Sequence, residues 1–163
     1  MTNNDVLRRI RYVFDFSDLK MVSIFSLADE QVELGMIRGW FKKEEDSGYR
    51  ACSDTQLALF LNGLINEKRG KREGLQPKPE KQLTNNIILT KLKIALNLKA
   101  EDVLELLSLA DFTISKHELS AFFRKPTHKH YRECKDQILR NFLKGMQLKY
   151  RPSAESKERS VWK

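Results

Sequence analysis

The stretch Cys52–Gly63 reads C-S-D-T-Q-L-A-L-F-L-N-G, and it returns 82 positions later at Cys134–Gly145 as C-K-D-Q-I-L-R-N-F-L-K-G. Sliding the sequence over itself by this offset, without a gap, aligns Thr2–Arg69 with Thr84–Arg151. Nineteen of the 68 aligned pairs are identical, and they include the run S-L-A-D at 26–29 and 108–111. Because identities at one fixed offset are the mark of an internal repeat, the chain is a tandem duplication.

The two copies predict the same series of helices. Apolar residues recur at helical spacing in four stretches of each unit, and Asn3-Asn4 is expected to cap the first helix. Ser53 with Gln56, and Ser115 with Glu118, have the spacing of a capping box at later helix starts. We therefore predict an all-α fold of two tandem homologous four-helix repeats, packed as one body with approximate two-fold symmetry.

The expected organisation has four parts. Composition separates the helical units from a linker rich in Gly, Pro and charge, and from a polar tail that ends near Trp162. The boundaries are a first helical repeat at 2–69, a charged linker at 70–83, a second helical repeat at 84–151 and a flexible C-terminal tail at 152–163.

Six positions of the opening motif are the same in both copies, and three of them carry a structural prediction. The cysteines predict two buried structural thiols, with a Cys52–Cys134 disulfide as the less favoured alternative. The aspartates fit the first turn of a helix, where a carboxylate meets the free N–H groups, better than a catalytic acid. The glycines interrupt an apolar stripe and predict close approach of another backbone, for which the sister helix of the other repeat is the candidate. These structural motif residues are Cys52, Asp54, Gly63, Cys134, Asp136 and Gly145.

Charge is distributed unevenly. The formal net charge is +8, and by our count residues 2–69 carry ten Lys/Arg against eleven Asp/Glu, whereas residues 84–151 carry thirteen against seven. An anionic partner is therefore expected to meet mainly the second repeat. No apolar run is long enough to span a membrane and the polar start M-T-N-N-D does not resemble a signal peptide, so we expect a cytoplasmic protein.

The candidate contacts to an anion or a nucleic acid lie in the second repeat. The predicted helix around Val103–Leu107, the S-L-A-D-F-T turn and the capped helix from Ser115 to Lys125 together loosely resemble a helix-turn-helix, although the turn is longer than usual. A solvated basic face is the plainer interpretation of the same residues. The candidates are Lys91, Lys93, Lys116, His117, Arg124, Lys125 and Lys129.

Other sites have weaker signals. His128, His130 and Cys134 have metal-ligand chemistry, but only one repeat has the set and zinc usually takes four ligands, so no metal site is predicted. The pairs Tyr49-Arg50 and Tyr131-Arg132 are expected to pin a loop, with the Arg reaching a nearby carboxylate. No phosphate-binding loop, nucleophile motif or zinc-protease motif occurs, so neither catalytic residues nor a cofactor are predicted.

The ordered motifs carry a family resemblance. The order N-N-x-x-L, S-L-A-D, W-F-K-K-E-E-D-x-G-Y-R-x-C-S-D and then I-S-K-H-E-L-S-A-F-F-R-K-P resembles the bacterial YehS-like family, which has two copies of a domain of unknown function. The resemblance covers residues 2–151. It implies an all-helical bacterial cytoplasmic protein and brings no catalytic or ligand residues.

Three functions remain open, in order of preference. The favoured hypothesis is a non-enzymatic binding module for DNA or RNA that uses the basic second repeat. The alternative is a protein-interaction module that docks through an apolar groove between the repeats or through Trp162. An enzyme with an unfamiliar site comes third.

Overall fold

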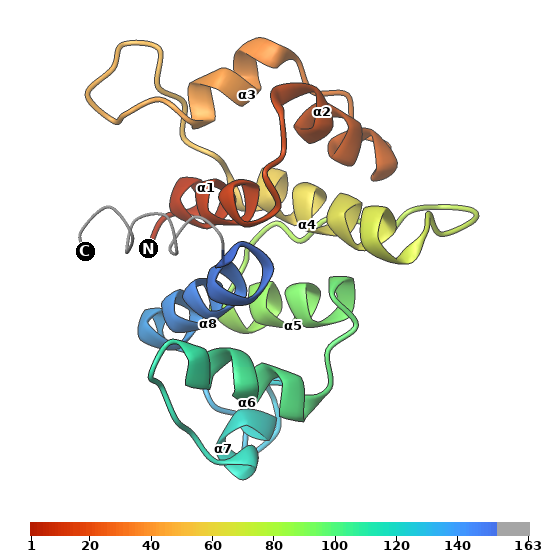
Figure 1. Cartoon of the computed structure of the whole chain (residues 1–163). Helices are drawn as coiled ribbons and strands as arrows, with labels where there is room; N and C mark the ends of the chain where they lie inside the picture. The colour runs from red at the N-terminus through yellow and green to blue at the C-terminus, as the bar shows by residue number, and fades with distance from the viewer. Residues whose placement is uncertain (153–163) are drawn as a thin grey trace, which may run out of the picture.

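The computed structural model describes residues 1–152, and these residues form eight α-helices and no strands (Figure 1). The predicted all-α fold is confirmed. Helices α2 and α6 begin and end 82 positions apart, as the alignment of the copies requires. In chain order the helices are α1 (Asn3–Phe14), α2 (Asp18–Leu27), α3 (Leu34–Trp40), α4 (Asp54–Arg69), α5 (Asn85–Ala95), α6 (Ala100–Leu109), α7 (Lys116–Ala121) and α8 (Asp136–Tyr150).

Four helices form the centre of the molecule. Helix α4 packs against α5 and α1 packs against α8, so the central contacts join the first half of the chain to the second. Helix α2 covers α4 on one side and carries α3 on its outer side, while α6 covers α8 on the other side and carries α7 (Figure 1). As a result α3 and α7 lie at opposite ends of the molecule, each followed by a long loop.

The helix starts use the caps that the sequence indicates, with one difference. Ser53 with Gln56, and Ser115 with Glu118, form the predicted capping boxes of α4 and α7. The predicted Asn cap of α1 is wrong, because Thr2 caps this helix and accepts a hydrogen bond from the backbone N–H of Asp5. Asn3 and Asn4 are thereby free to bond elsewhere.

A single hydrophobic core runs through both repeats. It includes the fully buried side chains of Trp40, Phe60 and Phe142. Helix α4 is buried over most of its length because α2, α5 and the segment that precedes α5 surround it. That segment is fixed by polar contacts, among them the Thr55 hydroxyl, which donates to the Glu80 carbonyl at 3.2 Å.

The helix-interior glycines mark the closest backbone approaches. A Cβ on Gly63 would overlap the carbonyl oxygen of Ile24 in α2, and a Cβ on Gly145 would overlap that of Leu106 in α6. The predicted close approach is confirmed, but its predicted partner is wrong. Each glycine contacts a helix of its own repeat, because α2 and α6 cross over α4 and α8 at this position.

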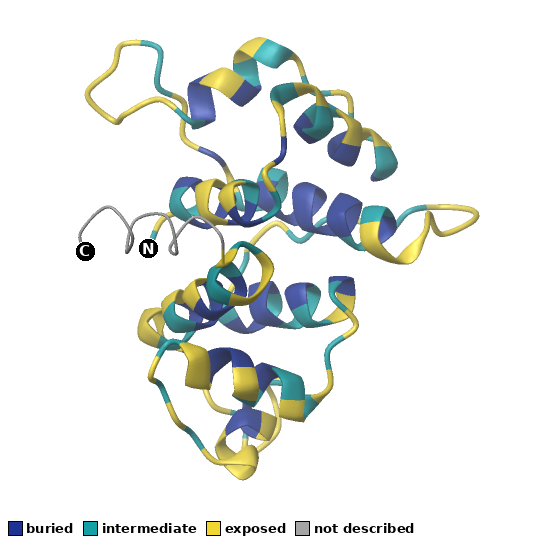
Figure 2. Ribbon diagram, in the orientation of Figure 1, coloured by how far each residue is buried: buried dark blue, intermediate teal, exposed yellow. Residues whose placement is uncertain are grey.

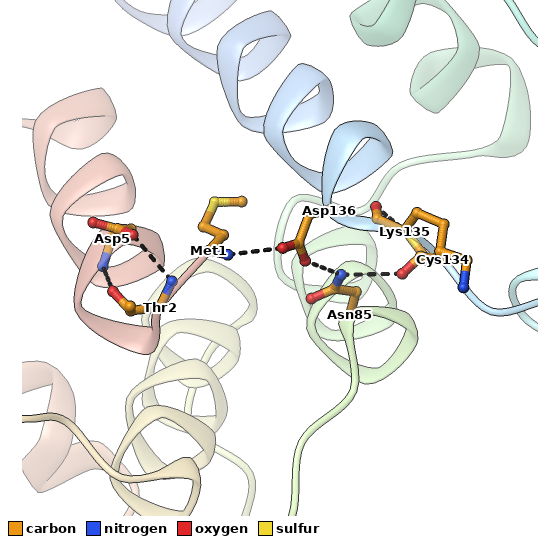
Figure 3. A network of polar contacts seen from close by, with 7 residues as sticks. All are labelled: Met1, Thr2, Asp5, Asn85, Cys134, Lys135 and Asp136. Carbon is orange, nitrogen blue, oxygen red and sulfur yellow. Dashed lines mark hydrogen bonds and ion pairs between the residues drawn. The ribbon is translucent and has the colours of Figure 1, made fainter.

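The two halves are joined by reciprocal polar contacts. The Asp54 carboxylate accepts a hydrogen bond from the backbone N–H of Leu83 at 2.8 Å, and the Asp136 carboxylate accepts one from the α-amino group of Met1 at 2.7 Å (Figure 3). The hydrogen bond from the α-amino group holds the pKa of Asp136 below its ordinary value. Each aspartate is the first residue of a helix, α4 or α8. It binds the residue that leads into the first helix of the other half, α5 or α1 respectively.

The far ends of the same helices make a second reciprocal pair. Arg69 of α4 donates to the Asn97 side chain at 2.7 Å, just beyond the end of α5. Arg151, which follows α8, donates to the carbonyl of Tyr12 near the end of α1. Each arginine therefore satisfies polar groups at the carboxyl end of a helix in the other half.

Candidate nucleic-acid interface

A buried asparagine holds the ends of the loop that follows α7. The Asn86 amide donates to the carbonyls of Phe122 at 3.0 Å and Arg132 at 2.8 Å, and its oxygen accepts from the N–H of Cys134 at 2.9 Å. Since Asn86 is on α5, it ties both ends of this loop to the central helices. Asn4 makes the same three bonds in the first repeat, to Trp40, Arg50 and Cys52.

Backbone bonds shape the loop between these ends. The N–H of His128 donates to the carbonyl of Lys125 at 2.8 Å, and the N–H of Tyr131 donates to the carbonyl of His128 at 3.0 Å. The N–H of His130 donates to Nδ1 of His128 at 3.0 Å, and the two imidazole rings lie 5.6 Å apart. The loop is therefore a set of bonded turns that holds its side chains in a defined arrangement.

We call residues 116–135, which comprise α7 and this loop, the basic segment. It contains six Lys/Arg against two Asp/Glu and all three histidines of the chain. The aligned residues 34–53 of the first repeat contain four Lys/Arg against three Asp/Glu. Much of the basic segment is exposed, and it forms the lower end of the molecule in the view of Figure 2.

Four of the seven candidate contacts are exposed in the basic segment. Lys116 forms an ion pair with Glu101 at 2.6 Å. Lys125 and Lys129 form no ion pair with any residue in the described part of the chain, 1–152. His117 and Lys129 line one cavity. These four residues, Lys116, His117, Lys125 and Lys129, are exposed.

The other three candidates lie elsewhere or are partly covered. Lys91 is inside the contact between α4 and α5, where its ammonium donates to the Asn62 side chain at 2.6 Å and lies 3.1 Å from a carboxylate oxygen of Glu80. The Lys93 ammonium lies 4.5 Å from the ring centroid of Phe123. Arg124 is half-buried. Lys91 therefore does not belong to the surface with which it was grouped, and Lys93 lies against Phe123 of the basic segment.

A cavity of about 640 Å³ opens between α7 and the loop. Ala121, Phe122 and Ile138 give it an apolar lining. A larger cavity of about 920 Å³ lies between the two halves, where the ends of α1, α4, α5 and α8 meet. Its two arginines, Arg69 and Arg151, already bond to polar groups at helix ends, so we take the cavity beside α7 as the candidate site.

The two cysteines are free and buried, as predicted, rather than joined. Burial, together with the charge of the neighbouring aspartate, raises the pKa of Cys52 and of Cys134 to about 12. At neutral pH both are therefore protonated thiols, which are poor nucleophiles. Among residues 1–152, three or more His, Cys, Asp or Glu side chains nowhere gather in a way that could hold a metal ion.

The Tyr-Arg pairs act differently from what their chemistry suggested. Neither Arg50 nor Arg132 forms an ion pair with a described residue, so the predicted reach to a carboxylate is wrong. Their backbone groups pin the loops: the N–H of Arg50 donates to the carbonyl of Gly39 at 3.0 Å, and that of Arg132 to the carbonyl of Ala121 at 3.2 Å. Sequence reasoning missed Asn4 and Asn86, although their identity in both copies was a usable signal.

The likeness to a helix-turn-helix does not extend to the geometry. Six residues separate α6 from α7, and α7 is itself only six residues long. A recognition helix enters the major groove with several exposed side chains and is joined to its partner by a turn of three or four residues. Helix α7 is too short for that role, and the loop after it carries most of the charge.

Comparison with known protein families identifies the family of the chain. The family described as "Protein of unknown function (DUF1456)" matches residues 3–70 and again residues 85–151, and the chain belongs to this family. The double match agrees with the duplication found in the sequence.

A curated relative extends this result. The chain is 43% identical over 147 residues to the "Uncharacterized protein YehS" of Escherichia coli (strain K12), a match that covers 90% of this chain and 94% of the relative. No solved structure matches the chain. Among the described residues, none of the helices has both the length and the apolar character that crossing a bilayer requires.

Proposed function

We propose that the protein is a non-enzymatic nucleic-acid-binding module that uses the basic segment. The observation that carries the proposal is the gathering of six Lys/Arg and three His in residues 116–135, at one exposed end of the molecule. A phosphate backbone binds such a surface by displacing its own counterions, without need of a deep site.

The arrangement of these charges favours a phosphate-binding surface over a self-neutralised one. Only Lys116 and Lys135 of the segment's Lys/Arg form ion pairs with described residues. Lys125 and Lys129 project from a loop whose ends Asn86 fixes, so binding would cost little ordering of the backbone. The opposite end of the molecule has the acidic run Glu44–Asp46 in the equivalent loop, which would repel phosphate.

The test is a salt titration with matched variants. Fluorescence anisotropy of labelled DNA and RNA is measured at several salt concentrations for the wild type and for Lys125→Ala/Lys129→Ala. We expect the variant to bind about tenfold or more weakly at low salt and to lower the slope of log K against log salt by about two. The control is Lys42→Ala/Lys43→Ala in the first-repeat loop, which should change neither quantity.

The protein-interaction hypothesis predicts the opposite result. If the wild type does not bind either nucleic acid at low salt, the basic segment is a solvated surface and the proposal is withdrawn. A protein partner would then be sought, since apolar docking survives moderate salt. Trp162, named above as a docking residue, lies outside the described residues.

We also infer that the two repeats are domains of residues 2–69 and 84–151, related by an approximate two-fold axis. The reciprocal pairs support this: Leu83 and Met1 are 82 positions apart, as are Asp54 and Asp136, and as are Arg69 and Arg151. On this view the linker 70–83 and the tail 152–163 are connecting and terminal segments, and only the second repeat carries the nucleic-acid surface.

A further inference from the structure

The cavity beside α7 combines an apolar lining with a polar rim. Phe122 and Ile138 provide apolar surface, and three residues with ring side chains, His117, His130 and Tyr131, also line the cavity. Its volume of about 640 Å³ lies within the range of small-molecule sites. Flat rings beside an apolar surface are suited to a flat, weakly polar group rather than to a bare phosphate.

Charged groups at the same cavity indicate what such a group is attached to. Lys129 and Arg132 line it, so a phosphate attached to the bound group would meet two cations. Two glutamates line it as well. Glu133 forms an ion pair with Lys135 at 3.1 Å, and one carboxylate oxygen of Glu118 accepts the capping-box bond from the N–H of Ser115 at 3.3 Å. The other oxygen is available to accept a hydrogen bond from an amino group.

We infer that this cavity takes one unpaired nucleobase, which makes the ligand a single-stranded nucleic acid. The inference rests on the proposed function and deepens it. In a duplex each base is stacked and paired, so it cannot enter the cavity without first being extruded. A single strand presents bases that can leave their neighbours and stack on aromatic side chains, while its phosphates bind the surrounding lysines and arginine.

The first repeat lacks the two histidines that line this cavity. At the positions aligned with His117 and His130 it has Gly35 and Gly48. The cavity that Gly35 lines at that end is smaller, about 420 Å³, and two glutamates, Glu30 and Glu33, also line it. The base cavity is therefore placed in the second repeat, and the first repeat supplies the substitutions that would remove its histidines.

The experiment compares three ligands with equal numbers of phosphates at one low salt concentration. They are a single-stranded oligonucleotide, made as DNA and as RNA, an abasic strand of the same length, and a duplex with the same total number of phosphates. We expect the wild type to bind the single strand about tenfold more tightly than the abasic strand or the duplex. A wild-type protein that binds all three equally, with the same salt dependence, overturns the base cavity and leaves the proposed function standing.

Variants locate the effect. His117→Gly/His130→Gly copies the glycines of the first repeat, and we expect it to weaken binding of base-bearing strands far more than binding of the abasic strand, so that the preference between them is abolished. Tyr131→Ala should do the same, and Tyr49→Ala at the aligned position should leave the preference intact. Circular dichroism and thermal melting establish that each variant is folded. A preference that survives both cavity variants also overturns the inference, and absence of binding to every ligand overturns both proposals.

Discussion

At the scale of single residues, the buried side chains of Asn86 and Asn4 hold the loops of the two repeats in place. They are 5% and 4% exposed, and each satisfies two backbone carbonyls and one backbone N–H. Buried backbone groups of this kind cost free energy when they lose their partners. These two side chains therefore fix the loops after α3 and α7, and Asn86 positions the basic segment.

Replacement of Asn86 by alanine tests this account. Three backbone groups would lose their partner, so we expect Asn86→Ala to lower the free energy of unfolding by about 1–3 kcal/mol, as measured by urea titration. Asn141→Ala, at a half-buried position of α8 without a side-chain bond to a described residue, should change it by less than about 0.5 kcal/mol. Equal effects of the two changes would contradict the role given to Asn86.

At the scale of the helices, the sequence predicted where helices begin and where two backbones come close, but not which helices pack together. The capping boxes of Ser53 and Ser115 are local patterns, so spacing alone identifies them. Gly63 revealed that a backbone comes close, but which backbone depends on how α2 crosses α4, and that is a property of tertiary packing. The Asn3-Asn4 pair was misread for the same reason, since an asparagine that bonds to a distant loop cannot be told from a cap by its neighbours.

The candidate site was predicted only in part. Lys125 and Lys129 could be predicted from the local charge alone, because lysines in a polar loop are expected to be exposed to solvent. Lys91 could not be excluded, because its contacts with Asn62 of α4 and with Glu80 of the linker depend on how α4 and the linker pack against α5. The cavity was likewise beyond sequence reasoning, since α7, the loop after it and α8 form it together.

Substitution of the helix-interior glycines tests how much the stability of the protein depends on the close crossings of α2 with α4 and of α6 with α8. An added Cβ would lie 2.8 Å from the carbonyl carbon of Ile24 for Gly63→Ala and 2.6 Å from that of Leu106 for Gly145→Ala. Because backbone atoms cannot move aside cheaply, each change should destabilise the protein by about 1–3 kcal/mol or more, despite the better helix propensity of alanine. Gly35→Ala in α3, which would meet nothing within 4 Å, should instead be neutral or stabilising. Thermal melting of the three variants checks the order.

At the scale of the whole molecule, the contacts that matter most cross between the halves. Helix α4 packs on α5 and α1 on α8, and the same pairing is reinforced at both ends by aspartates and arginines. The linker contributes its own bonds near Glu80, whereas the stretch around Gly70–Leu75 is exposed. The connection between the halves is therefore covalent at one place and non-covalent over a large buried surface.

Cleavage of the linker tests how strong the non-covalent part is. Leu75 is 94% exposed, and Lys71 and Arg72 beside it are exposed sites for trypsin. We expect brief digestion to cut there first and the two fragments to elute together from a size-exclusion column, separating only in denaturant. Fragments that separate under native conditions would show that the halves are independent domains on a tether.

The crossing contacts also bear on the order in which the protein is made. During synthesis the first repeat emerges before α5 and α8 exist, so the faces of α1 and α4 that later pack against those helices stay open to water. Asp54 can meet Leu83 early, whereas the bond from Arg151 to the Tyr12 carbonyl forms only after α8 has been made. The first repeat therefore leaves the ribosome before the helices that complete its packing have been synthesised. We expect the native state to form only after α8 has emerged.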